Sequence, residues 1–315
     1  MMTIDKMLGI DYPIIVAPMF LISNTAMIKA AMDNGITAAF PALNFRTDEE
    51  LRSAILELKN HSNKPFGVNL IVNKSNLLYK SQLKTLAELK VDFIITSLGS
   101  PEEVIKTCKP LGIKVFCDVV DTAYAKKVEA LGADAVIAVN NQAGGHAGNI
   151  DPATLVKQLK AEIKIPIISA GGIAKAAHIK EIIEAGAAGV SVGTIFIASE
   201  EAPVSAEYKQ AMVDYGAKDI MRTTKMSGSA LTVINTPYVK EMGTEANFLE
   251  RLLHKNKTLK KYVKMLIAWR GMKAIEKAAF SATYKTVWCA GPSIEYVKSI
   301  RPMKEIIQDL TLGLK

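Results

Sequence analysis

Eight short runs rich in Val, Ile, Ala and Phe alternate with stretches of helical periodicity, and this alternation most constrains what the chain can fold into. The runs are apolar at successive positions, which is typical of parallel strands that are covered on both faces. Several helical stretches begin at a capping residue, such as Asp48 or Asp151, or end at a glycine, such as Gly132. The predicted strands are 14–17, 38–40, 66–70, 93–96, 114–118, 135–139, 167–170 and 190–192. The predicted helices include 25–34, 48–58, 81–89, 101–108, 122–131, 152–163 and 178–185.

The repeat of roughly 20–30 residues per strand-helix unit favours a closed barrel over an open sheet. An open dinucleotide-binding sheet carries G-x-G-x-x-G, and no two glycines in this chain stand at i and i+2. We therefore predict an α/β chain with a (β/α)₈ TIM barrel. Residues 204–284 are basic and lack a strong strand signal, so they are predicted as a helical, basic lid subdomain inserted near the C-terminus. The barrel then consists of 1–203 and 285–315, and helix 302–312 returns as its eighth helix.

The formal net charge of +8 is unevenly distributed along the chain. Ten of the 39 Lys and Arg residues and one of the 31 acidic residues lie in 251–285, so this segment carries +9 and the rest of the chain −1. Its aromatic residues Tyr262 and Trp269 fall among aliphatic residues at helical spacing. That spacing favours a solvated helix face over a nucleic-acid-binding patch, which pairs basic residues with exposed aromatic ones. A site for an acidic or phosphorylated partner is the alternative.

Cysteine usage and apolar run lengths bound the environment of the protein. Cys108, Cys117 and Cys289 form no C-x-x-C pair, which argues against a disulfide framework or a zinc ribbon. The chain also lacks H-x-x-x-H, so no metal site is expected. No apolar run reaches the roughly 18 residues of a membrane span, and the first residues lack the apolar core of a secretory signal. We expect a cytoplasmic protein that binds neither membrane nor nucleic acid, and the sequence is compatible with a homodimer.

Glycines follow two neighbouring predicted strands, at the end of a barrel where active sites lie. Gly171 and Gly172 come directly after strand 167–170, and Gly193 with Thr194 comes after strand 190–192. Because glycine has no Cβ, backbone N–H groups at such positions can approach a phosphate closely. One glycine pair also suits an ordinary tight turn, but two such sites on adjacent strands favour phosphate binding.

His146 is the one histidine that follows a predicted strand, in the loop after 135–139. Small residues flank it: Ala143, Gly144, Gly145 and Ala147. They allow a planar ligand to approach the backbone while the imidazole points at it. An imidazole titrates near neutral pH and suits a general base or a hydrogen-bond donor to an anion. A structural histidine is the alternative interpretation.

One tempting motif is interpreted as a coincidence. Residues 189–193 match G-x-S-x-G, the nucleophile elbow of α/β-hydrolases. That elbow requires a sharp turn between a strand and a helix, whereas Ser191 lies inside an apolar run. We expect Ser191 to be a small core residue of the last strand.

Taken together, the strand-end pieces resemble the nitronate monooxygenase family, formerly called 2-nitropropane dioxygenases, which are FMN-dependent barrel flavoproteins. The matching pieces are 13–19, 65–69, 132–138, 143–146, 169–173 and 192–194, and 288–310 resembles the C-terminal return of the family. They occur in order through nearly the whole chain, and the Ala-Gly-Gly-His piece at 143–146 is quite specific.

The resemblance implies an FMN cofactor and a set of residues that bind it. The phosphate would lie at Gly171, Gly172, Gly193 and Thr194, the flavin ring against Ala17, Pro18 and Met19, and Asn69 would hydrogen-bond the ring edge. Further cofactor-binding residues would be Asp118, Ala143, Gly144, Ser169 and Ala170. His146 would be the catalytic residue, which faces the flavin and deprotonates a neutral nitroalkane, whereas an anionic nitronate needs no base. The flavin would take an electron from the nitronate, and O₂ would complete cleavage to a carbonyl compound and nitrite.

The chain departs from the family pattern in places, and two other functions stay open. Gln142 stands where the family often has Glu, Ile195 where Arg is usual, and Asp118 where some members place a Lys near the flavin. The runner-up is a related FMN-dependent enoyl-acyl-carrier-protein reductase using NAD(P)H, for which the basic segment 251–285 would bind the acidic carrier protein. Against it, strand 14–17 leads into Ala-Pro-Met, where those reductases resemble Gly-Gly-Met. A non-catalytic FMN-binding barrel is the third possibility.

Overall fold

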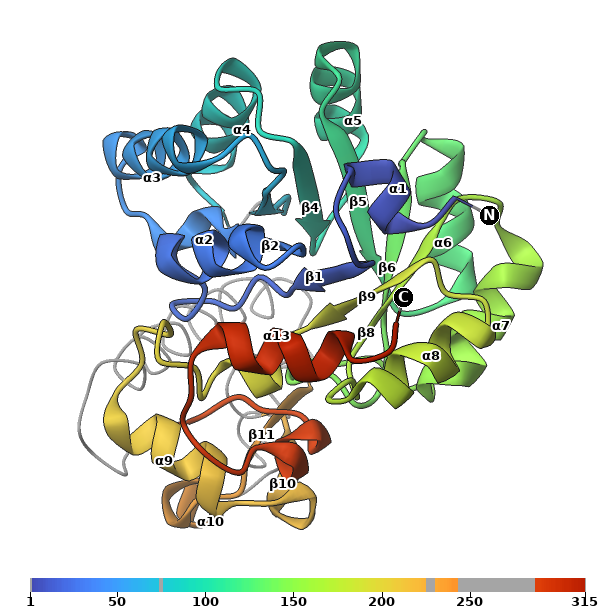
Figure 1. Ribbon diagram of the computed structural model, residues 1–315. Helices are drawn as coiled ribbons and strands as arrows, with labels where there is room; N and C mark the ends of the chain where they lie inside the picture. Colours follow the sequence, from blue (N-terminus) through green and yellow to red (C-terminus); the bar gives the residue numbers. More distant parts are fainter. Residues whose placement is uncertain (1, 74–75, 225–229, 243–286, 315) are drawn as a thin grey trace, which may run out of the picture.

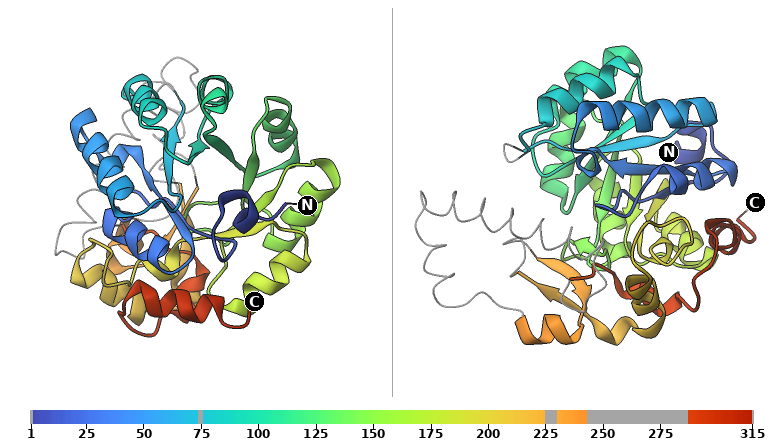
Figure 2. Two further views of the ribbon diagram at one scale, coloured as in Figure 1. Left: turned by 45° about the horizontal axis from the view of Figure 1, so that its top comes forward. Right: turned by 90° about the vertical axis from the view of Figure 1, so that its left-hand side faces the viewer.

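Eight parallel strands close into a barrel, and a helix follows each strand on the outside, in the computed structural model of the chain (Figures 1 and 2). The structure describes residues 2–73, 76–224, 230–242 and 287–314. The strands, in barrel order, are β1 (Ile14–Val16), β2 (Thr37–Pro41), β3 (Gly67–Ile71), β4 (Phe93–Ser97), β5 (Lys114–Val119), β6 (Ala135–Val139), β8 (Ile167–Ala170) and β9 (Gly189–Val192). The helices that follow them are α2 (Thr25–Asp33), α3 (Asp48–His61), α4 (Tyr79–Glu88), α5 (Glu102–Cys108), α6 (Thr122–Ala130), α7 (Pro152–Glu162), α8 (Ala176–Glu184) and α13 (Met303–Thr311). The predicted (β/α)₈ barrel is confirmed.

The barrel interior is a packed core that is closed at its amino-terminal end. Phe93 and Phe116 stack inside it with ring centroids 5.1 Å apart. Gly67 leaves room for this pair, because a Cβ at that position would lie 2.1 Å from the Phe93 ring. The short helix α1 (Ile4–Leu8) precedes β1 and inserts the fully buried Ile4 into the interior cluster. A ligand site is therefore expected at the opposite, carboxyl-terminal end, which we term the barrel mouth.

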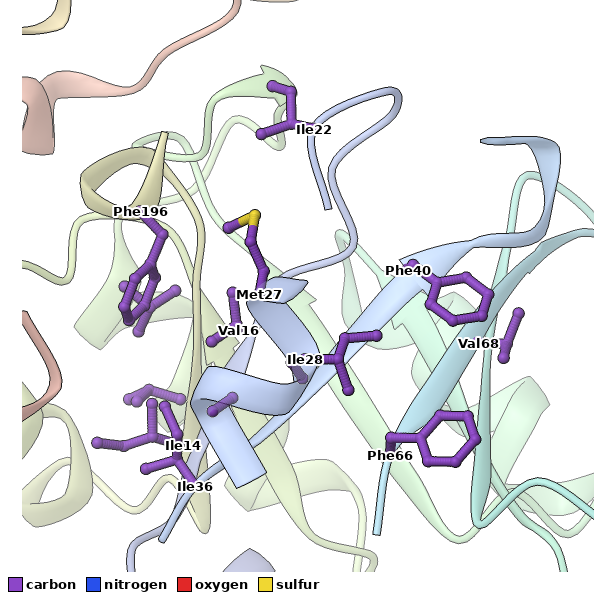
Figure 3. Close-up of a cluster of buried hydrophobic side chains, with 14 of the residues drawn as sticks. Ile14, Val16, Ile22, Met27, Ile28, Ile36, Phe40, Phe66, Val68 and Phe196 are labelled. Atoms are coloured by element: carbon purple, nitrogen blue, oxygen red, sulfur yellow. The ribbon is translucent and has the colours of Figure 1, made fainter. Parts of the chain in front are cut away.

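A second apolar layer joins the strands to the surrounding helices. Val16 of β1 and Met27 and Ile28 of α2 are fully buried and lie between strand and helix (Figure 3). α13 packs against both α2 and α8, and it lies beside them in Figure 1. Its apolar face buries Met303, Ile306, Ile307 and Leu310. The predicted return of the C-terminal helix as the eighth barrel helix is confirmed.

The described part of 204–284 contains strands, which corrects the expectation of an all-helical insert. It comprises α9 (Ala206–Asp214), β10 (Ile220–Thr223), β11 (Leu231–Ile234) and α10 (Pro237–Met242). β10 pairs antiparallel with β11, and β11 pairs antiparallel with β7 (Gly145–His146) in the loop after β6. β11 is buried at all four positions, so its pattern did not alternate, and its length of four residues left no clear strand signal. The domain limits stay a prediction, and segment 251–285 lies outside the described residues.

Three further features of the described residues bear on possible functions. None of the helices there is long and apolar enough to pass through a membrane. No group of three or more His, Cys, Asp or Glu side chains within the described ranges is arranged to hold a metal ion. The three cysteines are free thiols.

Candidate active site

Alternation along the strands determines which side chains face the barrel mouth. Ile15, Ile95 and Phe116 belong to the interior cluster, together with Ile137 and Ile168. Side chains in a strand point to the same face at every second position, so the next inward positions are the last before the mouth. These are Ala17, Ser97, Asp118, Val139 and Ala170, and by the same rule Asn69 follows Gly67 on β3. The mouth therefore has a polar side over β3, β4 and β5 and an apolar side over the other strands.

The polar side of the mouth is a hydrogen-bonded row of three residues. Asn69 is 7% exposed, and its Nδ2 group donates to the Ile95 carbonyl at 3.1 Å and to Ser97 Oγ at 2.7 Å. The Ser97 hydroxyl in turn donates to Oδ2 of Asp118. Because both N–H groups of the Asn69 amide are used in this way, its Oδ1 is the atom left to accept a hydrogen bond from a ligand.

Asp118 is a carboxyl group with an unusual affinity for protons. Asp118 is half-buried, yet the protein packed around its carboxyl group removes water from it and raises the pKa of Asp118 to about 6, while the hydrogen bond from Ser97 opposes part of that rise. Ser97 was not predicted as a site residue. Its signal was its position, since it ends the strand that lies between the strands of Asn69 and Asp118.

The loop after β1 is fixed by side chains that the sequence analysis did not single out. The Ser23 hydroxyl accepts from the Met19 N–H at 2.9 Å and donates to the Ala17 carbonyl at 2.9 Å. Asn44 Oδ1 accepts from the Leu21 N–H at 2.8 Å, and Leu21 has a φ of 60°. The predicted residues Ala17, Pro18 and Met19 therefore lie in a well-braced turn at the apolar side of the mouth.

The two glycines after β8 allow two loops to approach each other closely. Gly171 has a φ of 112°, and a Cβ there would lie 2.4 Å from Asn140 Oδ1 and 2.5 Å from the Ala143 nitrogen. Gly172 has a φ of 80°, and a Cβ there would lie 2.5 Å from Gln142 Oε1. Gly171 thus excludes other residues for both conformational and steric reasons, and Gly172 excludes them because of its backbone conformation.

Ser169 differs from the other predicted residues of this strand. Its neighbours Ile168 and Ala170 face the barrel interior, so its own side chain faces away from it. The Asn140 amide lies 3.5 Å from Ser169 Oγ and also donates to the Gly171 carbonyl at 3.1 Å. Asn140 is fully buried, and through these contacts it links the end of β6 to the end of β8.

The C-terminal return of the chain completes the glycine-rich side of the mouth. Thr194 Oγ1 accepts from the Gly291 N–H at 3.0 Å, which leaves its own hydroxyl proton to donate elsewhere. A Cβ on Gly291 would lie 2.3 Å from the Gln142 carbonyl oxygen, and one on Gly144 would lie 2.9 Å from the Gly291 nitrogen. Gly291 was not predicted as a site residue, although it brings the loops of Thr194 and Gly144 together.

Gly193 joins this side of the mouth to the loop after β1. A Cβ on Gly193 would lie 3.3 Å from the Met19 sulfur and 3.5 Å from the Ala17 Cβ. The predicted residues at the ends of β1, β6, β8 and β9 therefore form a continuous series of contacts. Asn69 and Asp118 lie on the opposite side of the same mouth, over β3 and β5.

His146 lies on β7, where the insert holds it in an extended conformation. Leu231 of β11 is its partner in the antiparallel pair, and Thr232 pairs with Gly145. On the other side of the loop, the Arg222 guanidinium donates to Asn149 Oδ1 at 3.0 Å and to the Ala147 carbonyl at 3.1 Å. The backbone around the predicted catalytic residue is thus held in place by β10 and β11, two strands of the insert.

The imidazole of His146 is accessible to solvent and yet has a perturbed proton affinity. The residue is exposed. The protein packed around the ring nevertheless reduces its hydration, and this desolvation lowers the pKa of His146 below its ordinary value of 6.5. The side chain is therefore mostly neutral at pH 7 and able to accept a proton.

The residues at the mouth fit a phosphorylated flavin. In the described part of the chain, the N–H groups of Gly171, Gly172 and Gly193 donate to no backbone acceptor. Together with the Thr194 hydroxyl they offer neutral donors for a phosphate. The apolar turn at Ala17–Met19 suits a flat ring, and Oδ1 of Asn69 suits the N–H at a flavin's edge.

Comparisons with known proteins agree with this architecture. A family model described as nitronate monooxygenase matches residues 76–313. The nitronate monooxygenase of Pseudomonas aeruginosa is 28% identical over 269 residues, which cover 71% of this chain and 76% of that protein. The (3aS,4S,5R,7aS)-5-hydroxy-7a-methyl-1-oxo-octahydro-1H-indene-4-carboxyl-CoA dehydrogenase of Rhodococcus jostii is 27% identical over 244 residues, which cover 78% of this chain and 68% of that protein.

Solved structures show the same fold. FabK from Thermotoga maritima superposes with a TM-score of 0.84 at 27% identity and covers 99% of this chain and 96% of its own. Nitroalkane oxidase from Streptomyces ansochromogenes superposes with a TM-score of 0.78 at 22% identity, covering 97% of this chain and 96% of its own, and supports the fold alone. Since the family model spans most of the barrel and the C-terminal return, the chain belongs to the nitronate monooxygenase family of oxidoreductases.

Proposed function

We propose that this protein binds FMN at the barrel mouth and oxidises nitronates or nitroalkanes with O₂ to a carbonyl compound and nitrite. The observation that carries the proposal is His146, a histidine with a lowered pKa that is held on β7, in the loop whose Ala143 lies against Gly171 at the end of β8. Membership in the nitronate monooxygenase family supports the same reaction.

The cofactor would lie across the mouth, from its glycine-rich side to its polar side. Gly171, Gly172, Gly193 and Thr194 would hold the phosphate through backbone N–H groups and a hydroxyl. Ala17–Met19 would lie against the ring, and Oδ1 of Asn69 would accept from its edge. When bound, FMN supplies the electron acceptor for the anionic substrate and the site at which O₂ reacts.

The chain itself has to supply proton transfer and orientation. A neutral nitroalkane carries a proton on the carbon beside its nitro group, and neutral His146 would accept that proton. A nitronate has already lost this proton, so for that substrate His146 would serve in binding. β11 and Arg222 would keep the backbone of His146 in place, because they hold the loop on both sides of it.

Paired assays with the purified protein test this proposal. We expect aerobic turnover of propyl-2-nitronate with release of nitrite, and little oxidation of NADH in the presence of a crotonyl thioester. A boiled sample and free FMN at the same concentration serve as controls for non-enzymatic oxidation. Nitrite at the level of these controls would reject the proposed reaction.

A second candidate is reduction of an enoyl thioester on acyl carrier protein with NAD(P)H. It is favoured by the likeness to FabK over nearly the whole chain and by the Rhodococcus relative, whose name describes a CoA thioester. The basic segment 251–285 would then attract an acidic carrier protein. Rapid NADH oxidation that depends on the crotonyl thioester, without nitrite from the nitronate, would select this function instead.

A further inference from the structure

Asp118 stands out at the barrel mouth because it is the one acidic side chain in the polar row over β3, β4 and β5. It is the next inward residue after Phe116, which belongs to the interior core. Its Oδ2 accepts from Ser97, whereas no described residue donates to its Oδ1. One carboxyl oxygen is therefore anchored and the other is left for whatever occupies the mouth.

Among the residues that the structure describes, none places a positive charge beside Asp118 that would hold it ionised. β4 and β6 flank β5, and beside Asp118 they place Ser97 and Ile137. The titratable neighbours within the described residues are Cys117 on β5 and Tyr124 on α6. Burial raises the pKa of Cys117 to about 12, and burial also raises the pKa of Tyr124, so both are neutral between pH 5 and 8.

We propose that Asp118 is a proton-exchanging group of the flavin site, which takes a proton from solvent when the bound flavin gains electrons and releases it on reoxidation. This inference rests on the FMN binding in the proposed function, but not on the identity of the substrate. Reduction adds negative charge to the ring, and a carboxylate next to that charge opposes it. The neutral acid instead donates a hydrogen bond toward it from Oδ1.

The direction in which pH changes the flavin reduction potential follows from the coupling between reduction of the flavin and protonation of Asp118. Burial places the pKa of Asp118 near 6 before any ligand binds, and added negative charge next to it raises that pKa further. Between the two pKa values, reduction draws in an extra proton, so the reduction potential falls more steeply with rising pH. Below both values Asp118 is neutral in either state, and above both it is ionised in either state.

The test is the midpoint potential of the bound flavin, measured against redox dyes from pH 5 to pH 8.5, in the wild type and in Asp118→Asn. Asn has the shape of the neutral acid and carries no charge. We expect equal potentials at pH 5 and a higher potential for the variant at pH 8.5. Asp121→Asn is the matched control, because it removes a nearby charge while Asn can still cap α6 by accepting from the Tyr124 N–H. It should follow the wild type throughout.

A second measurement needs no cofactor. The folded state of the apoprotein binds a proton at Asp118 up to about pH 6, whereas an unfolded Asp releases it near 3.8, so stability falls as pH rises through that window. The urea midpoint of Asp118→Asn should therefore exceed that of the wild type at pH 8 and equal it at pH 4.

The outcomes separate this inference from the proposed reaction. A potential difference that is the same at every pH, or absent, would overturn the role of Asp118 even if nitronates are oxidised. A difference that appears only above pH 6 supports the role even if nitronates are not substrates. Failure of wild-type protein to bind FMN would reject both, and unchanged urea midpoints would reject the proton affinity on which the inference depends.

Discussion

Replacement of His146 by Asn is expected to lower kcat/KM for a neutral nitroalkane about 10²–10⁴-fold, since removal of a positioned general base has effects of that size. The loss for the corresponding nitronate should be much smaller, because the nitronate has no proton to give up. FMN should stay bound, since the contacts proposed for its phosphate lie at the ends of β8 and β9. Steady-state assays on both substrates measure the two losses.

The pH dependence provides an independent check on this role. The rate with the nitroalkane should rise with pH through the pKa of His146 and then level, because only the neutral imidazole accepts a proton. Since desolvation lowers that pKa, the rise should lie on the acid side of 6.5. His61→Asn is the matched control, because His61 lies on α3 and pairs with Asp33 away from the mouth. Equal losses on both substrates for His146→Asn would indicate that His146 positions the ligand instead.

Replacement of Gly171 by Ala is expected to weaken FMN binding on the order of 10²-fold. A Cβ there would lie 2.4 Å from Asn140 Oδ1 and 2.5 Å from the Ala143 nitrogen, so the loop after β6 must move. Such movement would misplace the N–H groups proposed to hold the phosphate, and each hydrogen bond to a charged group contributes about 1.5–3 kcal/mol. Fluorescence quenching of FMN on titration with apoprotein measures the dissociation constant.

Gly112→Ala is a control that separates the effect of a steric clash at Gly171 from the effect of a strained backbone. Gly112 also has a positive φ, 81°, but no atom lies within 4 Å of a Cβ built there. Both variants therefore force Ala into a left-handed conformation, at a cost of about 1–2 kcal/mol in stability. If the close approach at Gly171 matters for the cofactor, Gly112→Ala should lose stability and still bind FMN normally. An equal loss of FMN affinity in both variants would contradict the proposed role of the Gly171 loop.

The barrel could be predicted from the sequence because its determinants are local. The barrel strands are short, mostly buried runs rich in Val, Ile, Ala and Phe, and the helices between them have clear apolar faces. The N-cap of α3 was predicted one residue too late. Thr47, and not Asp48, accepts from the Glu50 N–H in a capping box. β11 was missed because four buried residues without alternation look like part of a helix or loop, and β10 because its four residues do not alternate either.

The candidate site was predictable where a residue type restricts the backbone, and less so where contacts join distant segments. Gly171 and Gly193 are recognisable because they directly follow strands. Gly291 is not, because its role depends on meeting Thr194, 97 residues away in the chain. The pairing of β7 with β11 is equally non-local, so the contact between the insert and the loop of His146 could not be predicted from the sequence. The proton affinity of Asp118 depends on its burial, which a position in the sequence does not reveal.

An anaerobic single turnover of the purified protein tests the proposed flavin chemistry. We expect a yellow protein that releases FMN on denaturation and whose visible flavin absorption bleaches when propyl-2-nitronate is added without O₂. Admission of O₂ should restore the absorption and release nitrite. A colourless protein that does not take up FMN would rule out the proposed function. So would a bound flavin that is bleached by NADH and unaffected by the nitronate, or one that neither donor reduces.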